Sequence, residues 1–344
     1  MHMADALLSP AVGGIMWATT ACTIAYCARK VQQDLDDRKI PLMGVLGAFI
    51  FAAQMINFTI PATGSSGHLG GGMILAILLG PYAAFLTIAS VLTVQALFFA
   101  DGGLLALGCN IFNLGVFPCF IAYPLIYKPI AGRSPTPLRI SIGATLAAII
   151  GLQLGALGVV FETVASGISE LPLNAFLSVM LPIHLAIGLV EGMVTTAVVT
   201  FVWKARPEIL ELTAAARPLG KLSIARVLTG LGIAAVITGG GLSWFASSSP
   251  DGLEWAMFKV SGSEELHAPE QGIHHALGTI QEKTSFLPDY GFKAGDSEAS
   301  EAHGGESWPS VNSGTSASGL VGGGLTLALA VVLGLMFRRR SQSA

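Results

Sequence analysis

The chain opens with Met1 and His2, a pair whose nitrogens can close on one metal ion in sequence. The α-amine of Met1 and the backbone nitrogen of His2 would form a five-membered chelate ring. The same backbone nitrogen and the imidazole Nδ1 of His2 would form a six-membered ring and leave one equatorial position for a further donor. Nitrogen-rich tetragonal sites of this kind suit Ni(II) and Cu(II), and we include Co(II). The alternative is a frayed terminus with an incidental histidine.

The rest of the chain, which must position this pair, has the composition of an integral membrane protein. Its 344 residues are 52% hydrophobic and only 11% charged, whereas soluble domains carry about 25% charged residues. The N-terminus has no basic stretch before its apolar run, so it does not resemble a cleaved signal peptide, and we expect the terminal amine to be kept. The four cysteines lie in apolar segments and are expected to be small buried hydrophobes: Cys22, Cys27, Cys109 and Cys119.

The hydrophobic pattern predicts an all-α polytopic membrane protein, because a spanning helix needs roughly 20 apolar residues. The predicted spans are residues 9–31, 41–60, 82–99, 104–127, 140–161, 175–203, 222–245 and 319–337, with a shorter apolar piece at 73–79. Lys and Arg gather at alternate turns, which places the N-terminus outside and the C-terminus in the cytoplasm by the positive-inside rule.

An irregular glycine-rich stretch, residues 61–72, follows the second predicted span and contains His68. Backbone of this kind is tolerated at membrane depth only where protein buries it or where it lines a cavity. The predicted topology places His68 on the same side of the membrane as the N-terminus. His68 can therefore supply the missing fourth nitrogen, and the alternative is a surface loop histidine.

Polar residues within the predicted spans are functional candidates, because burying them is costly. Such groups can hold an imidazole in one tautomer or orient a terminal amine, and the alternative is that they tie helices together by hydrogen bonds. The candidates are Gln54, Asn57, Gln95, Asp101, Asn110 and Asn113. His184 and Glu191 share one face of a helix, where we favour buried structural hydrogen bonds over a pair on a transport path.

A polar insert, residues 247–318, separates the last two predicted spans and carries four histidines: His267, His274, His275 and His303. A histidine-bearing acidic loop on the outer face could raise the local metal concentration. We favour the alternative, a partly ordered spacer with incidental histidines.

Several short motifs occur together in one order along the chain. They are Met1-His2 with Asp5, Leu8-Ser9-Pro10, Ser65-Ser66-Gly67-His68-Leu69-Gly70, Ile77 to Pro81, Gln95 to Phe98, Asp101-Gly102-Gly103 with Asn110, and His184-Leu185 with Glu191-Gly192. In these motifs the first two hundred or so residues resemble the substrate-specific component of energy-coupling-factor cobalt/nickel transporters, the CbiM/NikM family. The run Ser249 to Trp255, which contains Pro-Asp-Gly-Leu-Glu, is similar to the PDGLE module that accompanies such components.

The resemblance implies a membrane domain at 1–204 with a bundle of about seven helices, and a cytoplasmic linker at 205–221. The C-terminal module, residues 222–344, would carry two transmembrane helices that flank an extracytoplasmic loop. The Met1 amine, the His2 amide and imidazole, and the His68 imidazole would bind the metal. The residues expected to support these ligands are Asp5, Gln95, Asp101 and Asn110. The family opening has a proline and a glycine where this chain has Ala4 and Ala6, and this difference leaves the ligand atoms unchanged.

The implied function is capture of Ni(II) or Co(II) for an ATP-driven importer in a bacterial inner (plasma) membrane, with the metal as transported substrate rather than cofactor. The chain has no Gly-x-x-x-x-Gly-Lys-Ser/Thr loop, so the energy would come from partner subunits: a transmembrane coupling (T) subunit and ATPase (A) subunits. We expect no enzyme activity and no nucleic-acid partner. One alternative is a proton-coupled secondary transporter, although Glu191 is nearly alone as a mid-span carboxylate. The other is an intramembrane metalloenzyme, which four protein nitrogens around the metal would disfavour because no equatorial position is left for water.

Overall fold

The computed structural model describes residues 2–34, 37–132, 135–269, 271–293 and 308–337. Helices make up most of this part of the chain. Within it, six helical segments are long and apolar enough to cross a membrane: 10–33, 81–99, 107–131, 137–166, 173–205 and 313–337. Lys39–Gln54 and Ala225–Gly240 are shorter apolar helices. The expected all-α polytopic membrane class is confirmed.

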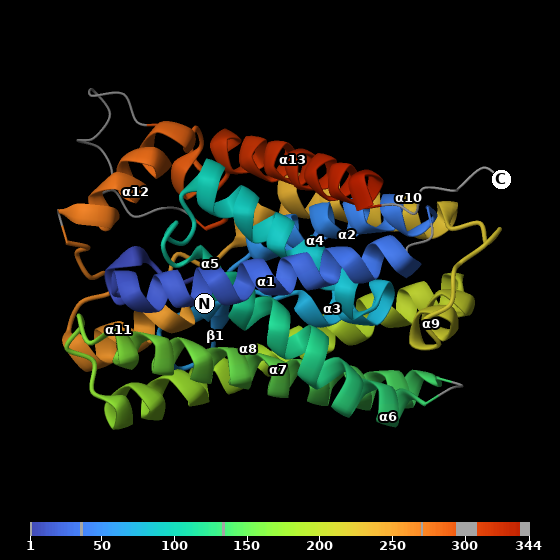
Figure 1. The fold of residues 1–344 in the computed structure, drawn as a ribbon, viewed down its shortest axis with the longest axis horizontal. Helices are drawn as coiled ribbons and strands as arrows, with labels where there is room; N and C mark the ends of the chain where they lie inside the picture. Colours follow the sequence, from blue (N-terminus) through green and yellow to red (C-terminus); the bar gives the residue numbers. More distant parts are fainter. Residues whose placement is uncertain (1, 35–36, 133–134, 270, 294–307, 338–344) are drawn as a thin grey trace.

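The elements in chain order are η1 (Asp5–Leu7), α1 (Pro10–Asp34), α2 (Lys39–Gln54), β1 (Phe58–Ile60), β2 (Ser65–Gly67), α3 (Gly72–Leu79), α4 (Pro81–Val94), η2 (Gln95–Phe99), α5 (Leu107–Ile111), η3 (Phe112–Tyr127), α6 (Lys128–Ala131), α7 (Pro137–Ser166), α8 (Leu173–Ala205), α9 (Pro207–Ala214), α10 (Ala225–Gly240), η4 (Leu242–Phe245), α11 (Gly252–Ser261), α12 (Gly272–Thr284), η5 (Pro288–Tyr290) and α13 (Ser313–Phe337). Figure 1 shows α11 and α12 at one end of the helix bundle and α6 and α9 at the opposite end.

The second predicted span ends earlier than expected. Helix α2 stops at Gln54, and the following residues form β1, which pairs antiparallel with β2 in the register Phe58 to Gly67. Gly64 lies in the turn with a φ of 75°, a conformation that suits glycine because it has no Cβ. The prediction of helix through residue 60 is wrong, since a tight hairpin takes up this part of the chain.

Helix α3 is short, as the sequence predicts, and it is buried along its whole length. Gly71 precedes it with a φ of 76°, and Gly80 follows it with a φ of 83°. Pro81 then begins α4, where its missing N–H costs nothing because the first helical N–H groups lack intrahelical partners. The element is therefore a half-length helix enclosed by protein rather than a span facing lipid.

The predicted helix over residues 104–127 is interrupted. The chain passes through a turn into α5 and then into η3, which is a π-helix with Pro118 and Pro124 inside it. A proline removes a backbone donor and displaces the preceding carbonyl, so it disturbs a regular α-helical ladder. The wide turns of η3 accommodate both prolines without ending the helix.

Glycine contacts hold the last helix, α13, against the rest of the bundle. A Cβ on Gly319 would lie 2.3 Å from the carbonyl oxygen of Gly239 in α10, so the two backbones cross at a distance that only glycine permits. A Cβ on Gly322 would lie 2.0 Å from the ring of Phe51 in α2. Small residues at such crossings are typical of packed transmembrane helices.

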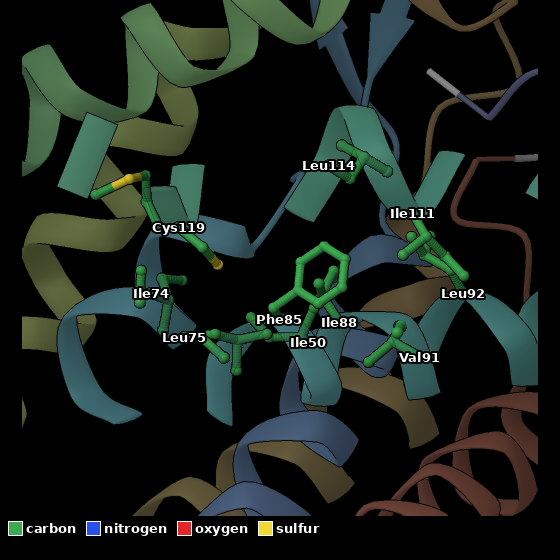
Figure 2. Packing of buried hydrophobic residues seen from close by; sticks show 14 of the residues in the cluster. Ile50, Ile74, Leu75, Phe85, Ile88, Val91, Leu92, Ile111, Leu114 and Cys119 are labelled. Atoms are coloured by element: carbon green, nitrogen blue, oxygen red, sulfur yellow. The ribbon is translucent and has the colours of Figure 1, made fainter. Parts of the chain in front are cut away.

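The core of the bundle lies around α4, where Phe85 is fully buried (Figure 2). The outer faces of the spans are apolar as well, as on α8, where Leu185, Leu189 and Met193 are each at least half exposed. An apolar face directed outward is expected where lipid is the solvent. The expectation of four buried cysteines is wrong for Cys22, which is exposed on α1, whereas the other three are buried.

The polar insert is more ordered than a spacer. Its described residues form α11, α12 and η5, and α11 begins with a capping box between Asp251 and Glu254. Both side chains accept hydrogen bonds from backbone N–H groups at the start of this helix. The described part of the insert is therefore ordered rather than a partly ordered spacer, and His303 lies outside the described residues.

Candidate metal centre

His2 and His68 come together in the folded chain. Their imidazole rings stack with centroids 4.8 Å apart and an interplanar angle of 28°. Both residues line a cavity of about 520 Å³, together with Asp101 and Asp251. The structure thus brings the first residues of the chain to the glycine-rich loop, as the topology predicted; Met1 lies outside the described residues.

Asn110 holds the backbone that follows His2. Its Oδ1 accepts a hydrogen bond from the Met3 nitrogen at 2.8 Å, and its Nδ2 donates to the Met3 carbonyl oxygen at 3.2 Å. The nitrogen of Gly103 donates to the same oxygen at 2.9 Å. Because Met3 is also fully buried, the terminus is threaded into the protein rather than frayed.

Asp101 contacts the imidazole of His2 directly. Its Oδ1 lies 2.7 Å from Nδ1 of His2, and its Oδ2 accepts a hydrogen bond from the hydroxyl of Tyr290. Burial raises the pKa of Asp101, but the charge and hydrogen bond of His2 and the hydrogen bond of Tyr290 outweigh burial, so this pKa lies well below its usual range. Asp101 is therefore ionised at neutral pH and is the acceptor for Nδ1–H of His2.

Asp5 contacts the backbone rather than a predicted ligand. Its Oδ1 accepts a hydrogen bond from the nitrogen of Ala106 at 2.9 Å, at the turn before α5. A Cβ on Gly103 would lie 1.8 Å from the same oxygen, so glycine is needed beside this carboxylate. Asp5 thus joins the N-terminus to the turn from which Asn110 follows.

The ring of His68 has a defined tautomer in this arrangement. Its Nδ1 lies 3.1 Å from the carbonyl oxygen of Leu69, which can only accept, so Nδ1 carries the proton and Nε2 keeps its lone pair. The carboxylate of Asp251 lies 3.7 Å from Nε2. Burial lowers the pKa of the His68 imidazole, so its neutral, metal-binding form is favoured.

The loop after His68 is fixed by side chains from two helices. Glu191 of α8 accepts hydrogen bonds from the nitrogens of Gly70 and Gly71, each at 3.0 Å. Gln54 of α2 donates to the carbonyl oxygen of Gly70 at 2.9 Å. Both backbone groups of Gly70 are therefore satisfied inside the protein, where an unpaired one would be costly.

Gln95 links this loop to the Asp101 side of the site. Its Nε2 donates to Oε1 of Gln54 at 3.0 Å and to the hydroxyl of Tyr290 at 3.2 Å. Gln95 contacts neither histidine and is a connector. Asn113 is placed differently, because it donates to Glu162 at 2.7 Å on the far side of η3.

His184 and Glu191 have the structural hydrogen bonds that we favoured. Nδ1 of His184 donates to the carbonyl oxygen of Met180 at 2.8 Å, and Glu191 caps the loop described above. Nε2 of His184 is buried beside a cavity of about 10 Å³ that His68 and Asp251 also line. That volume is close to the space of one water molecule.

The C-terminal module reaches the site, which sequence reasoning missed. The nitrogen of Ser66 in β2 donates to the carbonyl oxygen of Pro250 at 2.8 Å, and the indole of Trp255 donates to the carbonyl oxygen of Thr63 at 3.0 Å. These contacts place Asp251 at His68. The PDGLE motif singled out Asp251, but no sequence signal distinguished Tyr290.

Among the described residues, no three His, Cys, Asp or Glu side chains are grouped in a way that would hold a metal ion. The described groups that line one cavity here include the imidazole rings of His2 and His68 and the carboxylates of Asp101 and Asp251.

Comparison with known proteins gives a consistent result. Residues 2–209 match the family described as cobalt uptake substrate-specific transmembrane region, and residues 225–339 match the PDGLE domain. A putative metal transport protein of Haloquadratum walsbyi is 37% identical over 210 residues, which are 61% of this chain and 93% of that protein. A putative fused nickel transport protein NikMN of Archaeoglobus fulgidus is 37% identical over 229 residues, which are 65% of this chain and 72% of that protein.

A crystal structure of a truncated transition metal transporter is similar in fold, with a TM-score of 0.53 and 30% sequence identity over 60% of this chain and 99% of that one. The family and these relatives are transport proteins, which confirms that the chain is not an enzyme and that the metal is substrate rather than cofactor. The matched residues cover most of the helices that surround His2 and His68. The chain therefore belongs to the family of CbiM-type substrate-specific transmembrane proteins of cobalt uptake, and it carries a C-terminal PDGLE domain.

Proposed function

We propose that this chain is the substrate-capture component of an ATP-driven energy-coupling-factor importer and that it binds Ni(II) or Co(II) outside the membrane. The observation that carries the proposal is the stacking of His2 on His68 beside a buried, ordered N-terminal backbone. The proposed ligands are the Met1 amine, the His2 amide and Nδ1, and Nε2 of His68. Four nitrogens in one plane suit Ni(II), and the family description supports cobalt.

Capture requires one rearrangement at His2. Its Nδ1 now faces Asp101, whereas the chelate uses this nitrogen. Rotation of the ring about the Cβ–Cγ bond exchanges the positions of Nδ1 and Cδ2 and turns Nδ1 away from the carboxylate. We infer that Asp101 holds Nδ1 until the metal takes its place, while His68 already presents the lone pair of Nε2.

Metal titration of the purified full-length chain tests the site. The wild-type chain should bind Ni(II) and Co(II) at about one ion per chain, as measured by competition with a chromophoric chelator and by metal analysis. His2→Gln should abolish binding, because it removes the imidazole and with it the six-membered ring. His68→Ala should lower affinity by more than the roughly 10–100-fold loss typical of changes to groups behind the ligands.

The matched control for both variants is His275→Ala, which removes an exposed histidine of α12. It should bind as the wild-type chain does. Unchanged affinity of His2→Gln would contradict the chelate.

The energy source requires a separate assay. We expect uptake of radioactive metal by cells only when coupling and ATPase subunits are expressed with this chain. Full uptake by the chain alone, abolished by a protonophore, would favour the proton-coupled alternative. The described spans offer it little support, since Glu191 caps a loop instead of facing a second carboxylate.

A further inference from the structure

The segment formed by α12 and η5 lies against the chain that carries Asp101. Gln281 of α12 donates hydrogen bonds to the carbonyl oxygens of Ala96, at 2.9 Å, and Gly102, at 2.7 Å. The nitrogen of Leu287 donates to the carbonyl oxygen of Phe98 at 3.2 Å. These bonds fix η5 over the end of η2, from which Asp101 follows.

Tyr290 is held in this position with an unfavourable backbone. Its φ is 58° and that of Asp289 is 49°, so two successive non-glycine residues are in the left-handed region. This region is unfavourable for residues with a Cβ, and such residues persist there when surrounding contacts determine the position. The contacts are a stacked ring of Phe99, with centroids 5.2 Å apart, and an edge contact with Phe51 at 6.1 Å.

The hydroxyl of Tyr290 occupies a link between the two ligand-bearing segments. It donates to Oδ2 of Asp101 and accepts from Nε2 of Gln95. On one side Asp101 contacts His2. On the other side Gln95 donates to Gln54, which donates to Gly70 in the loop of His68. One hydroxyl thus joins the hydrogen bonds of both histidine-bearing segments.

The donor role of this hydroxyl has a consequence for Asp101. A carboxylate with one oxygen engaged can turn about its Cβ–Cγ bond and present either oxygen to the imidazole. With Oδ2 engaged by Tyr290, Oδ1 alone faces His2, and the plane of the carboxylate is set. Asp101 holds the nitrogen that the proposed chelate needs, so a carboxylate fixed in this plane stabilises the metal-free orientation of His2 and lowers the apparent affinity for metal.

We propose that Tyr290 is a positioning residue of the metal centre, which orients His2 through Asp101 and so makes the C-terminal module part of the site. This inference rests on the proposed function. The module then determines how tightly the terminus binds its metal, in addition to covering the loop of His68. The stacked ring of Tyr290 stabilises the fold, whereas its hydroxyl orients the carboxylate at the site.

Tyr290→Phe in the full-length chain separates these two roles, because it keeps the ring and removes the hydroxyl. We expect affinity for Ni(II) and Co(II) to rise by about tenfold, because a loosened Asp101 releases Nδ1 of His2 more readily, with the thermal midpoint of unfolding nearly unchanged. The ligand-field absorption bands of the bound Ni(II) should stay as in the wild-type chain, since Nδ1 has then left the carboxylate. Tyr26→Phe, at an exposed tyrosine of α1, is the matched control and should change neither reading.

A double-mutant cycle with Asp101→Asn tests the route. Tyr290→Phe should have little further effect on affinity in the Asp101→Asn background, because its action passes through that carboxylate. An equal gain in both backgrounds would overturn the route through Asp101. Wild-type or lower affinity in Tyr290→Phe would overturn the inference alone, whereas a wild-type chain that binds neither metal would overturn the proposed function with it.

Discussion

The carboxylate of Glu191 in α8 accepts a 3.0 Å hydrogen bond from the nitrogen of Gly70, two residues after His68. Its second oxygen accepts from the nitrogen of Gly71, at the same distance, just before α3 begins. Gly71 is the N-cap of α3 and Gly70 precedes it, so neither nitrogen has an intrahelical partner. A mid-span acid therefore fixes one end of the loop that carries a proposed ligand.

Glu191→Ala should loosen this loop and weaken metal binding. Both backbone N–H groups would lose their acceptor in a buried place, which typically costs about 1–3 kcal/mol for each unsatisfied group. We expect an affinity loss of about 10–100-fold together with a lower thermal midpoint. Glu191→Gln keeps one acceptor oxygen. Its metal affinity should therefore lie between those of the wild-type chain and Glu191→Ala, as measured by metal competition titration.

The matched control for that series is Glu162→Gln. Glu162 is also a buried helical acid, and it accepts a hydrogen bond from Asn113 at 2.7 Å instead of contacting the His68 loop. The Glu162→Gln variant should have a lower thermal stability than the wild-type chain and an unchanged metal affinity. Equal affinity losses in the Glu162 and Glu191 variants would show that general destabilisation, not the loop, is responsible.

Asn110→Ala should free the N-terminal backbone. The side chain donates to and accepts from Met3, so its loss leaves both buried groups of that residue without this partner. We expect metal affinity to fall by about tenfold or more. Asn110→Asp retains the acceptor for the Met3 nitrogen and should bind better than the alanine variant. Proteolysis of the terminus followed by mass spectrometry would check the cause, since only a released terminus is cut rapidly.

The start of α11 should give the folded protein a pH dependence. Burial, followed by the charge of Asp251, raises the pKa of Glu254 to about 7. A raised folded-state pKa contributes stability that is complete below the ordinary carboxyl pKa of about 4.3 and is lost as pH rises through 7. Glu254→Gln stays neutral and should be more stable than the wild-type chain at pH 8, by on the order of 1–3 kcal/mol, and by a clearly smaller amount at pH 5.

Thermal unfolding in detergent at both pH values measures this difference. Glu208→Gln, at an exposed acid of α9, is the control and should show no such change between pH 5 and pH 8. A stabilisation of Glu254→Gln that is the same at both pH values would contradict the assignment to ionisation.

The orientation predicted by the positive-inside rule can be tested with a pair of cysteine variants. His275 on α12 and Glu208 on α9 are both exposed. The two helices lie at opposite ends of the bundle (Figure 1). A membrane-impermeant maleimide should label His275→Cys in intact cells and Glu208→Cys only after permeabilisation. The reverse pattern would place the N-terminus, and the proposed capture site, in the cytoplasm.

Local signals in the sequence predicted much of the fold. The glycine and proline at 80–81 mark the end of α3 and the start of α4, and the span topology brought His2 and His68 to one side. The hairpin of β1 and β2 was missed, because strands this short show no hydrophobic periodicity beside a long apolar helix. The predicted support by Asn110 and Asp101 corresponds to contacts with Met3 and His2.

The missed part of the site depends on contacts between distant residues. Tyr290 meets an acid 189 positions earlier in the chain, and Ser66 meets Pro250 across 184 positions. No spacing, periodicity or charge pattern within either segment encodes such a meeting. The resemblance at residues 249–255 named the PDGLE motif, but it did not say which loop the motif contacts.

The pairing of Ser66 with Pro250 joins two parts of one polypeptide. Docking of the C-terminal module is consequently an intramolecular equilibrium, with an effective concentration that reaches about the millimolar range for short linkers. Its occupancy does not fall when the protein is diluted or weakly expressed. Every copy that folds carries its own cover for the site in fixed one-to-one ratio, and a competing free module would have to exceed that concentration to displace it.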